Sequence, residues 1–277
     1  MIRFFLISHF ILLSFIGAAQ KMSVDYFNEG QTFLSNEQYP EAIGSLKYLV
    51  DNCPKFNWYA DAHYNLGYAY YKNKQYSEAI AVFREILGKD SIETVDYSGD
   101  IMSNPYSNFK NGAAYLISQS YFDTGQYDSA LVYLELSETV YPYEHFCGNA
   151  IGENEVEDQI YKAKIYEALG QNDRFEHILL SSVFLAEEYS IAPLHLLRKY
   201  YQKNFKGSVL RKEAQKAFEH IEKEQAPNSK ICRYFITFHQ TRILVSGSFD
   251  QFTALEGKPT ETDLMQSSFY NMLLQIE

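Results

Sequence analysis

The sequence predicts an all-α fold in which amphipathic helix pairs stack side by side as a solenoid, about six pairs with a terminal capping helix. Three observations predict it. Between Ala60 and Ser91, apolar residues recur at helical spacing on both sides of a short polar turn. Similar spacing recurs before and after this stretch. A turn of the form Gly-x-x-Asp, in which glycine can end one helix and aspartate can cap the next, occurs at Gly125, Gly170 and Gly247.

The stretch from Ala60 to Ser91 reads as one helix pair, which cannot bury its apolar faces without neighbours. Its two helices flank the polar turn Lys72-Asn73-Lys74-Gln75. Because Gly67 has no side chain, the second helix can approach the first closely there. The apolar positions of the two helices are Leu66, Gly67, Tyr70 and Tyr71, then Ala79, Ile80, Phe83, Ile86 and Leu87.

The pattern Leu66-Gly67-x-x-Tyr70, followed by Ala79-x-x-x-Phe83, resembles the tetratricopeptide repeat, whose frame is about 34 residues. The same frame fits residues 23–56, 111–142 and 156–187 with more departures. The resemblance implies a right-handed superhelix of such units over residues 20–187, in a protein that binds other proteins and is not an enzyme.

Two stretches with little helical periodicity, residues 92–110 and 143–155, interrupt these units. Insertions in repeat arrays form loops on one face and are often functional. A flexible connection without a function is the alternative, and the sequence leaves this choice open.

Residues 188–277 are expected to form degenerate helical repeats and a capping helix. Apolar spacing predicts helices over residues 193–204 and 208–224. A last helix is predicted from Pro259 to about Gln275, with Thr260 and Asp263 resembling a capping box.

The turn at Gly247 predicts a further helix pair, with a first helix over residues 229–246 and a second beginning at residues 250–255. The alternative is a β-hairpin, because residues 231–245 are rich in β-branched and aromatic side chains. The roughly helical spacing of the apolar residues favours the helix.

The chain begins with Arg3, an apolar run to Ile16, and then Gly17-Ala18-Ala19. This order is typical of a secretory signal peptide, and we expect residues 1–19 to be removed by cleavage after Ala19. An uncleaved membrane anchor is the alternative, although the run is short for a span of about 20 residues. No cysteine stands directly after the apolar run, so a lipoprotein anchor is not indicated. We expect an exported protein without membrane insertion after cleavage, periplasmic or secreted in a Gram-negative bacterium.

The formal net charge of −11 argues against nucleic acid or an anionic lipid surface as the partner. Cys53, Cys147 and Cys232 are too few and too widely spaced for a disulfide framework. One disulfide with one thiol, or three thiols, are both compatible with the sequence.

No sequence motif of metal, nucleotide or nucleophilic chemistry is present. The histidines after residue 19 show no metal-ligand spacing, and each is expected on a helix surface or between helices: His63, His145, His177, His195, His220 and His239. We therefore expect no catalytic residues, no cofactor and no metal site, and a protein that is not an enzyme.

In tetratricopeptide repeats the first helix of each unit lines a concave groove. Carried onto this chain, that resemblance implies an aromatic groove for a peptide or protein segment, lined by Phe27, Gln31, Asp61, Tyr64, Asn65, Tyr68, Tyr71, Tyr115, Gln119 and Phe122. Asn65 matches one member of the clamp with which some family members hold a partner's C-terminal carboxylate, but the basic members are missing. The alternative is that some of these tyrosines pack on adjacent helices.

Three functions remain in view. A non-enzymatic interaction scaffold of the cell envelope is favoured, because tyrosine offers large contact area at low entropic cost. An accessory protein that binds a glycan or a peptidoglycan fragment is the alternative, since aromatic rings also stack on sugars. A helical hydrolase or lyase with unrecognised site residues is the third.

Overall fold

A computed structural model describes residues 23–93, 103–183, 191–225, 232–247 and 259–277. The chain divides into two compact units, Met1–Ile151 and Gly152–Glu277. The expected signal peptide lies outside the described residues, as does the helix start expected at residues 250–255.

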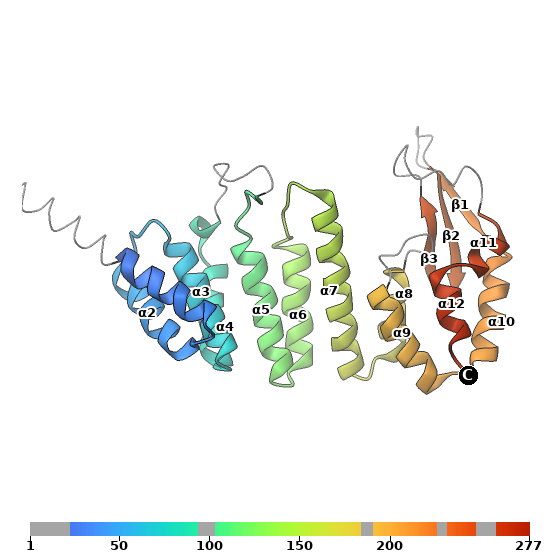
Figure 1. Cartoon of the computed structure of the whole chain (residues 1–277), viewed down its shortest axis with the longest axis horizontal. Coiled ribbons are helices and arrows are strands. Elements are labelled where there is room, and N and C mark those ends of the chain that lie inside the picture. Colours follow the sequence, from blue (N-terminus) through green and yellow to red (C-terminus); the bar gives the residue numbers. More distant parts are fainter. Residues whose placement is uncertain (1–22, 94–102, 184–190, 226–231, 248–258) are drawn as a thin grey trace, which may run out of the picture. The chain divides into compact units, whose positions relative to one another are not determined.

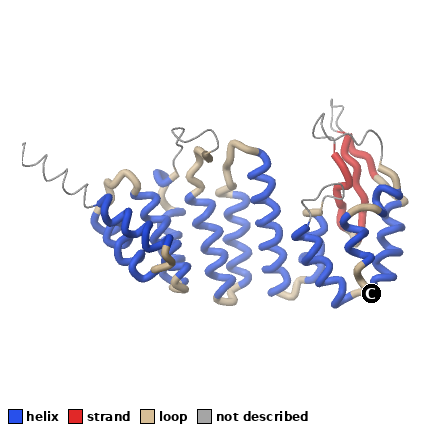
Figure 2. Tube along the Cα trace, in the orientation of Figure 1, coloured by secondary structure: helices blue, strands red, loops and turns tan. Residues whose placement is uncertain are grey.

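The first unit is built entirely of antiparallel helices over its described residues (Figures 1 and 2). Each labelled helix packs against the next along the chain, and α3 also lies against α5. This arrangement confirms the helix-pair solenoid. A helix over residues 23–35 is followed by α2 (Tyr39–Asn52), α3 (Tyr59–Lys72), α4 (Tyr76–Leu87), the 3-10 turn η1 (Asp90–Ile92), α5 (Phe109–Asp123) and α6 (Tyr127–Thr139).

Glycine allows the close helix contacts within the first two pairs. A Cβ atom on Gly67 would lie 2.6 Å from the ring of Phe83, which is fully buried. In the preceding pair, a Cβ atom on Gly30 would lie 2.7 Å from the side chain of buried Leu46. Both contacts join residues at equivalent places in their pairs, so the close approach predicted at Gly67 belongs to the repeat itself.

The helix turns follow the predicted glycines but not the predicted caps. Gly125 and Gly170 adopt φ values of 74° and 69°, the left-handed region that glycine tolerates best. The aspartate caps expected at these two turns are wrong, because Gln126 and Gln171 are the N-cap residues and neither makes a side-chain cap. The aspartates lie instead in the first turn, where a negative charge is favourable.

The two interruptions of the repeats contact each other in their described parts. Asn104 and Asn108 donate side-chain hydrogen bonds to the Glu144 carbonyl oxygen, both at 2.9 Å. The Glu144 N–H donates in return to the Asn108 side-chain oxygen at 2.8 Å. At the start of α5, the Glu93 carboxylate accepts hydrogen bonds from the Lys110 N–H and the Ser107 hydroxyl. These bonds tie the first interruption to Glu144 of the second, and Glu93 to the start of α5.

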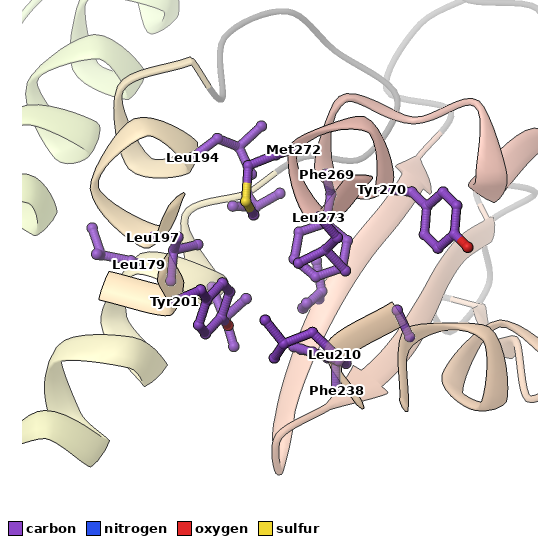
Figure 3. Close-up of a cluster of buried hydrophobic side chains, with 14 of the residues drawn as sticks. Leu179, Leu194, Leu197, Tyr201, Leu210, Phe238, Phe269, Tyr270, Met272 and Leu273 are labelled. Carbon is purple, nitrogen blue, oxygen red and sulfur yellow. The ribbon is translucent and has the colours of Figure 1, made fainter. Parts of the chain in front are cut away.

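The second unit combines helices with a three-stranded antiparallel sheet of order β1-β2-β3. Its buried core joins α8, α9, α10 and α12 to the sheet, and Figure 3 shows Leu179, Leu197, Tyr201 and Leu210 within it. The elements are α7 (Gly148–Ala168), α8 (Asn172–Ser181), α9 (Ile191–Asn204), α10 (Gly207–Phe218), β1 (Glu222–Gln225), β2 (Cys232–Phe238), β3 (Thr241–Gly247), α11 (Glu261–Met265) and α12 (Ser268–Leu274).

The helix predicted over residues 229–246 is wrong, because β2 and β3 form a hairpin there. Ile236 pairs with Ile243, and both are fully buried, whereas Thr237 and Arg242 on the other face are exposed. This alternation suits β-branched and aromatic residues on a half-buried sheet. The helix predicted over residues 208–224 is also shorter than expected. It ends at Phe218, and the exposed strand β1 follows at Glu222 and pairs with β2.

The C-terminal capping box is confirmed, although the last predicted helix is two short helices. The Thr260 hydroxyl accepts from the Asp263 N–H, and the Thr260 N–H donates to the Asp263 carboxylate at 2.8 Å. The end of the chain is held by α10, since the Gly207 N–H donates to the Glu277 carbonyl oxygen at 2.8 Å.

Within the described residues, no helix has the length and apolar character needed to cross a membrane. Cys53, Cys147 and Cys232 form no disulfide within the same residues.

Candidate partner-binding face

Ten residues were predicted to line a groove, and we call them the first-helix face: Phe27, Gln31, Asp61, Tyr64, Asn65, Tyr68, Tyr71, Tyr115, Gln119 and Phe122. They lie on the helix of residues 23–35 and on α3 and α5. Every one of them is partly buried, neither in the core nor fully exposed. Their contacts therefore decide which are open to a partner.

Tyr64 is committed to packing between repeats. Its ring lies 5.7 Å from the ring of Phe83 and 5.5 Å from that of Phe109 on the next helix pair. Its hydroxyl occupies the place where Gly112 of α5 would otherwise carry a side chain, and a Cβ atom there would collide with it. Burial raises the pKa of Tyr64 to about 12. Tyr64 therefore joins α3 to α5.

Tyr71 is also engaged within the unit. Its hydroxyl donates to the Asp123 carboxylate at 3.3 Å, and its ring lies 5.9 Å from that of Tyr76. Burial, and then the charge of Asp123, raise the pKa of Tyr71. At the same end of the face, Phe122 packs edge-on against Tyr127 at 5.3 Å.

Tyr68 lies between these two tyrosines and, like them, packs against the buried cluster that contains Phe83, but its hydroxyl is less engaged. Its hydroxyl makes no hydrogen bond with any residue that the structure describes, and Lys72 lies 5.9 Å from its ring centroid. The side chains of Asn65 and Gln119 likewise make no hydrogen bond to described residues. Amide and hydroxyl groups without partners can satisfy the backbone groups of a bound segment.

Phe27, Phe56 and Trp58 form an aromatic cluster that we did not predict from the sequence. It extends the first-helix face beside the helix of residues 23–35. Trp58 stacks on Phe27 with ring centroids 5.5 Å apart, and meets Phe56 edge-on at 5.6 Å. Trp58 is the chain's single tryptophan and is 48% exposed. The connection at residues 57–59 is longer than the family's frame, and that extra length was the signal that could have pointed to Trp58.

Behind this face, α3 buries His63 completely. Its Nδ1 atom lies 3.4 Å from the Lys89 ammonium and its Nε2 atom 3.4 Å from the Glu85 carboxylate. Burial first, and then the charge of Lys89, lower the pKa of His63 to about 4. The imidazole is therefore neutral near pH 7, which fits its predicted place between helices.

In the second unit, His239 joins three elements and is not on a helix as predicted. It lies in the turn between β2 and β3, where His239 and Gln240 adopt φ values of 44° and 62°. Its Nδ1 atom lies 2.5 Å from Glu176 of α8, and its Nε2 atom 3.0 Å from Glu213 of α10. Burial alone would lower the pKa of His239, but the hydrogen bonds to both carboxylates outweigh it, so the pKa is raised.

The side of His239 that faces α10 borders a pocket of about 400 Å³. Both nitrogens face carboxylates, so a protonated imidazole can donate to each. The pocket is lined by Glu213, Lys216, Ala217, His220, Glu222, Thr237, Phe238 and His239.

Neither the first-helix face nor the pocket beside His239 has the side chains of a metal site. Among the residues that the structure describes, no group of three or more histidine, cysteine or acidic side chains could hold a metal ion. The first-helix face instead offers aromatic area and polar groups with open hydrogen-bonding capacity, which suits the binding of a chain segment.

Family models of the tetratricopeptide repeat match residues 27–91 and 112–143. Both segments are tetratricopeptide repeats. These repeats generally mediate protein–protein interactions, and proteins of the family are typically scaffolds without enzymatic activity. The two matched segments include all ten residues of the first-helix face.

Among solved structures, this chain is similar to nearly identical TPR-like repeats of the kinesin light chain type from Podosopora anserina. The likeness has 19% identity and a TM-score of 0.46, and covers 65% of this chain and 85% of that one. A single-residue variant of the same protein gives 18% identity and a TM-score of 0.45 over the same shares. A comparison with proteins of curated function finds no match.

Proposed function

We propose that the N-terminal repeats bind a peptide or protein segment along the first-helix face, and that the protein acts as a non-enzymatic scaffold. The observation that carries this proposal is the state of Tyr68. It is a partly exposed aromatic residue in the middle of the face, and its hydroxyl makes no hydrogen bond to described residues. Tyrosine in such a place combines contact area with a polar tip, as at many protein interfaces.

The surroundings of Tyr68 support binding by a segment rather than by a globular surface. Tyr64 and Tyr71 on the same helix are held by α5, so the face is ordered before a partner arrives. A pre-ordered face loses little conformational entropy on binding. Asn65 and Gln119 supply amides for the backbone of an extended segment.

We further propose that the protein works in the cell envelope, in the periplasm of a Gram-negative bacterium or secreted from it. The basic start, apolar run and small residues before Gln20 support export with removal of residues 1–19. N-terminal sequencing of the protein from fractionated cells tests this, and a mature form beginning at Gln20 in the envelope fraction is expected. Recovery with Met1 in the cytoplasm would contradict it.

Site-specific photo-crosslinking in envelope extract tests the binding face. A photoreactive amino acid at Tyr68 should trap a protein, identified by mass spectrometry. The matched control is Val132 on α6, which is 61% exposed but outside the face. Equal crosslinking from both positions would contradict the proposal, and retention on peptidoglycan without any protein product would favour the glycan alternative.

Truncation of the same residue gives the energetic test. Tyr68→Ala should leave the melting temperature nearly unchanged and weaken the trapped partner by about 2 kcal/mol, or roughly 30-fold. Tyr64→Ala is the contrasting variant, because Tyr64 packs between α3 and α5 and loss of such a packed aromatic side chain should cost about 3 kcal/mol of folding stability. A large fall in melting temperature for Tyr68→Ala would show that Tyr68 is a packing residue.

A further inference from the structure

The cluster of Phe27, Phe56 and Trp58 holds an exposed tryptophan ring at one end of the first-helix face. The rings of Phe27 and Trp58 are inclined by only 29°, whereas Phe56 meets Trp58 at 89° and supports it from the side. Phe56 is buried, which fixes this support, while Trp58 keeps 48% of its surface exposed. A large ring that is held in place yet exposed is suited to stacking against a flat ligand group.

A carboxylate, Asp61, follows Trp58 by three residues. Trp58 is the N-cap residue of α3 and Asp61 is the third residue of the helix. Residues three apart at a helix start lie on the same side of it. Asp61 is therefore on the same side of the start of α3 as Trp58, and it is itself a member of the first-helix face.

No cation within the described residues neutralises Asp61. It makes no ion pair there, and Lys55, which precedes Trp58 by three residues, does not pair with it. Burial raises the pKa of Asp61, with its own backbone N–H opposing this shift. A partly desolvated carboxylate without a counter-charge gains from an incoming cation.

We propose that Phe27, Trp58 and Asp61 form a subsite for an arginine side chain of the bound segment, an inference that rests on the proposed peptide binding. A guanidinium group is planar, so it can stack on the tryptophan ring while donating to the carboxylate. Lysine can form the ion pair but cannot stack in this way. Among the ten residues of the face Asp61 is the only charged one, which favours a basic segment over an acidic one.

The single tryptophan reports on this subsite directly, because selective excitation of the full chain observes Trp58 alone. The probes are pools of acetylated, amidated peptides with random flanks and a fixed central arginine, lysine, citrulline or glutamate. An uncharged chitin oligosaccharide tests the glycan alternative. We expect the arginine pool to change Trp58 emission with a Kd at least about tenfold below that of the citrulline pool.

Asp61→Asn should abolish the advantage of the arginine pool over the citrulline pool. Asp51→Asn is the matched control, since Asp51 is an exposed carboxylate of α2 paired with Lys47 at 2.9 Å, and it should keep that advantage. Circular dichroism of both variants should show an unchanged fold. An Asp61→Asn variant that still prefers arginine would overturn the subsite.

Equal binding of the arginine and citrulline pools would overturn the arginine subsite while leaving peptide binding intact. A response to chitin alone, or to no probe, would also overturn it. In those cases the crosslinking experiment at Tyr68 decides separately whether the face binds protein, so the two proposals can fail independently.

Discussion

The contact between Gly67 and Phe83 gives a sharp test of how the repeats are held together. In Gly67→Ala the new Cβ atom would lie 2.6 Å from one ring carbon of Phe83 and 2.8 Å from another. Phe83 is fully buried, so its ring has no free space to move into. Overpacking of this kind typically costs about 1–3 kcal/mol, which exceeds the gain of about 0.5–1 kcal/mol from replacing glycine by alanine within a helix.

Gly44→Ala is the matched control for this substitution. Gly44 lies in α2, and a Cβ atom there would meet nothing within 4 Å. That variant should be stabilised by about 0.5–1 kcal/mol. Thermal and urea unfolding, followed by circular dichroism, measure both variants. When Gly67→Ala is combined with Phe83→Leu, the loss of stability should be smaller than the sum of the two single losses, because the smaller side chain leaves room for the methyl group. Stabilisation of Gly67→Ala to the same degree as Gly44→Ala would refute the reasoning.

Other contacts give three further predictions. The folded-state pKa of His63 is lowered to about 4, so folding favours the neutral ring. As the pH is lowered from about 7.5 to about 5, the free energy of unfolding should therefore fall by about 2 kcal/mol. His63→Gln should flatten this dependence in acid titrations. The pKa of His239 is raised, so its stabilising contribution should be present below about pH 6.5 and be lost as the pH rises through the folded value; His239→Gln should remove that loss in melts above neutrality. In Gly207→Ala a Cβ atom would collide with the Ile276 carbonyl oxygen, so we expect a loss of about 1–3 kcal/mol by urea unfolding, and no change would show that the C-terminal contact is dispensable.

The sequence was most informative where local spacing and long-range packing agree. The Gly67 contact could be predicted because a glycine at a fixed place in the frame has one use, the close approach of the second helix. The hairpin of β2 and β3 could not be predicted in the same way. Over such a short run, its apolar residues satisfy helical and alternating spacing equally well. Burial on the core of the second unit decided between them. The turns at Gly125 and Gly247 resemble one another in sequence, yet the helix α5 precedes the first and the strand β3 leads into the second.

The tyrosines of α3 show why a binding face cannot be assigned from spacing alone. Tyr64 and Tyr68 are four residues apart, so they share one side of the helix, and their chemistry is identical. What separates them is the neighbouring repeat: α5 offers Gly112 opposite Tyr64, which leaves room for the ring to be covered. Tyr68 keeps an uncommitted hydroxyl with respect to the described residues. The register between neighbouring helices determines these differences, and it is set by packing rather than by either helix alone. Partner binding at this face should therefore depend on Tyr68 and Trp58, whereas loss of Tyr64 should act through stability.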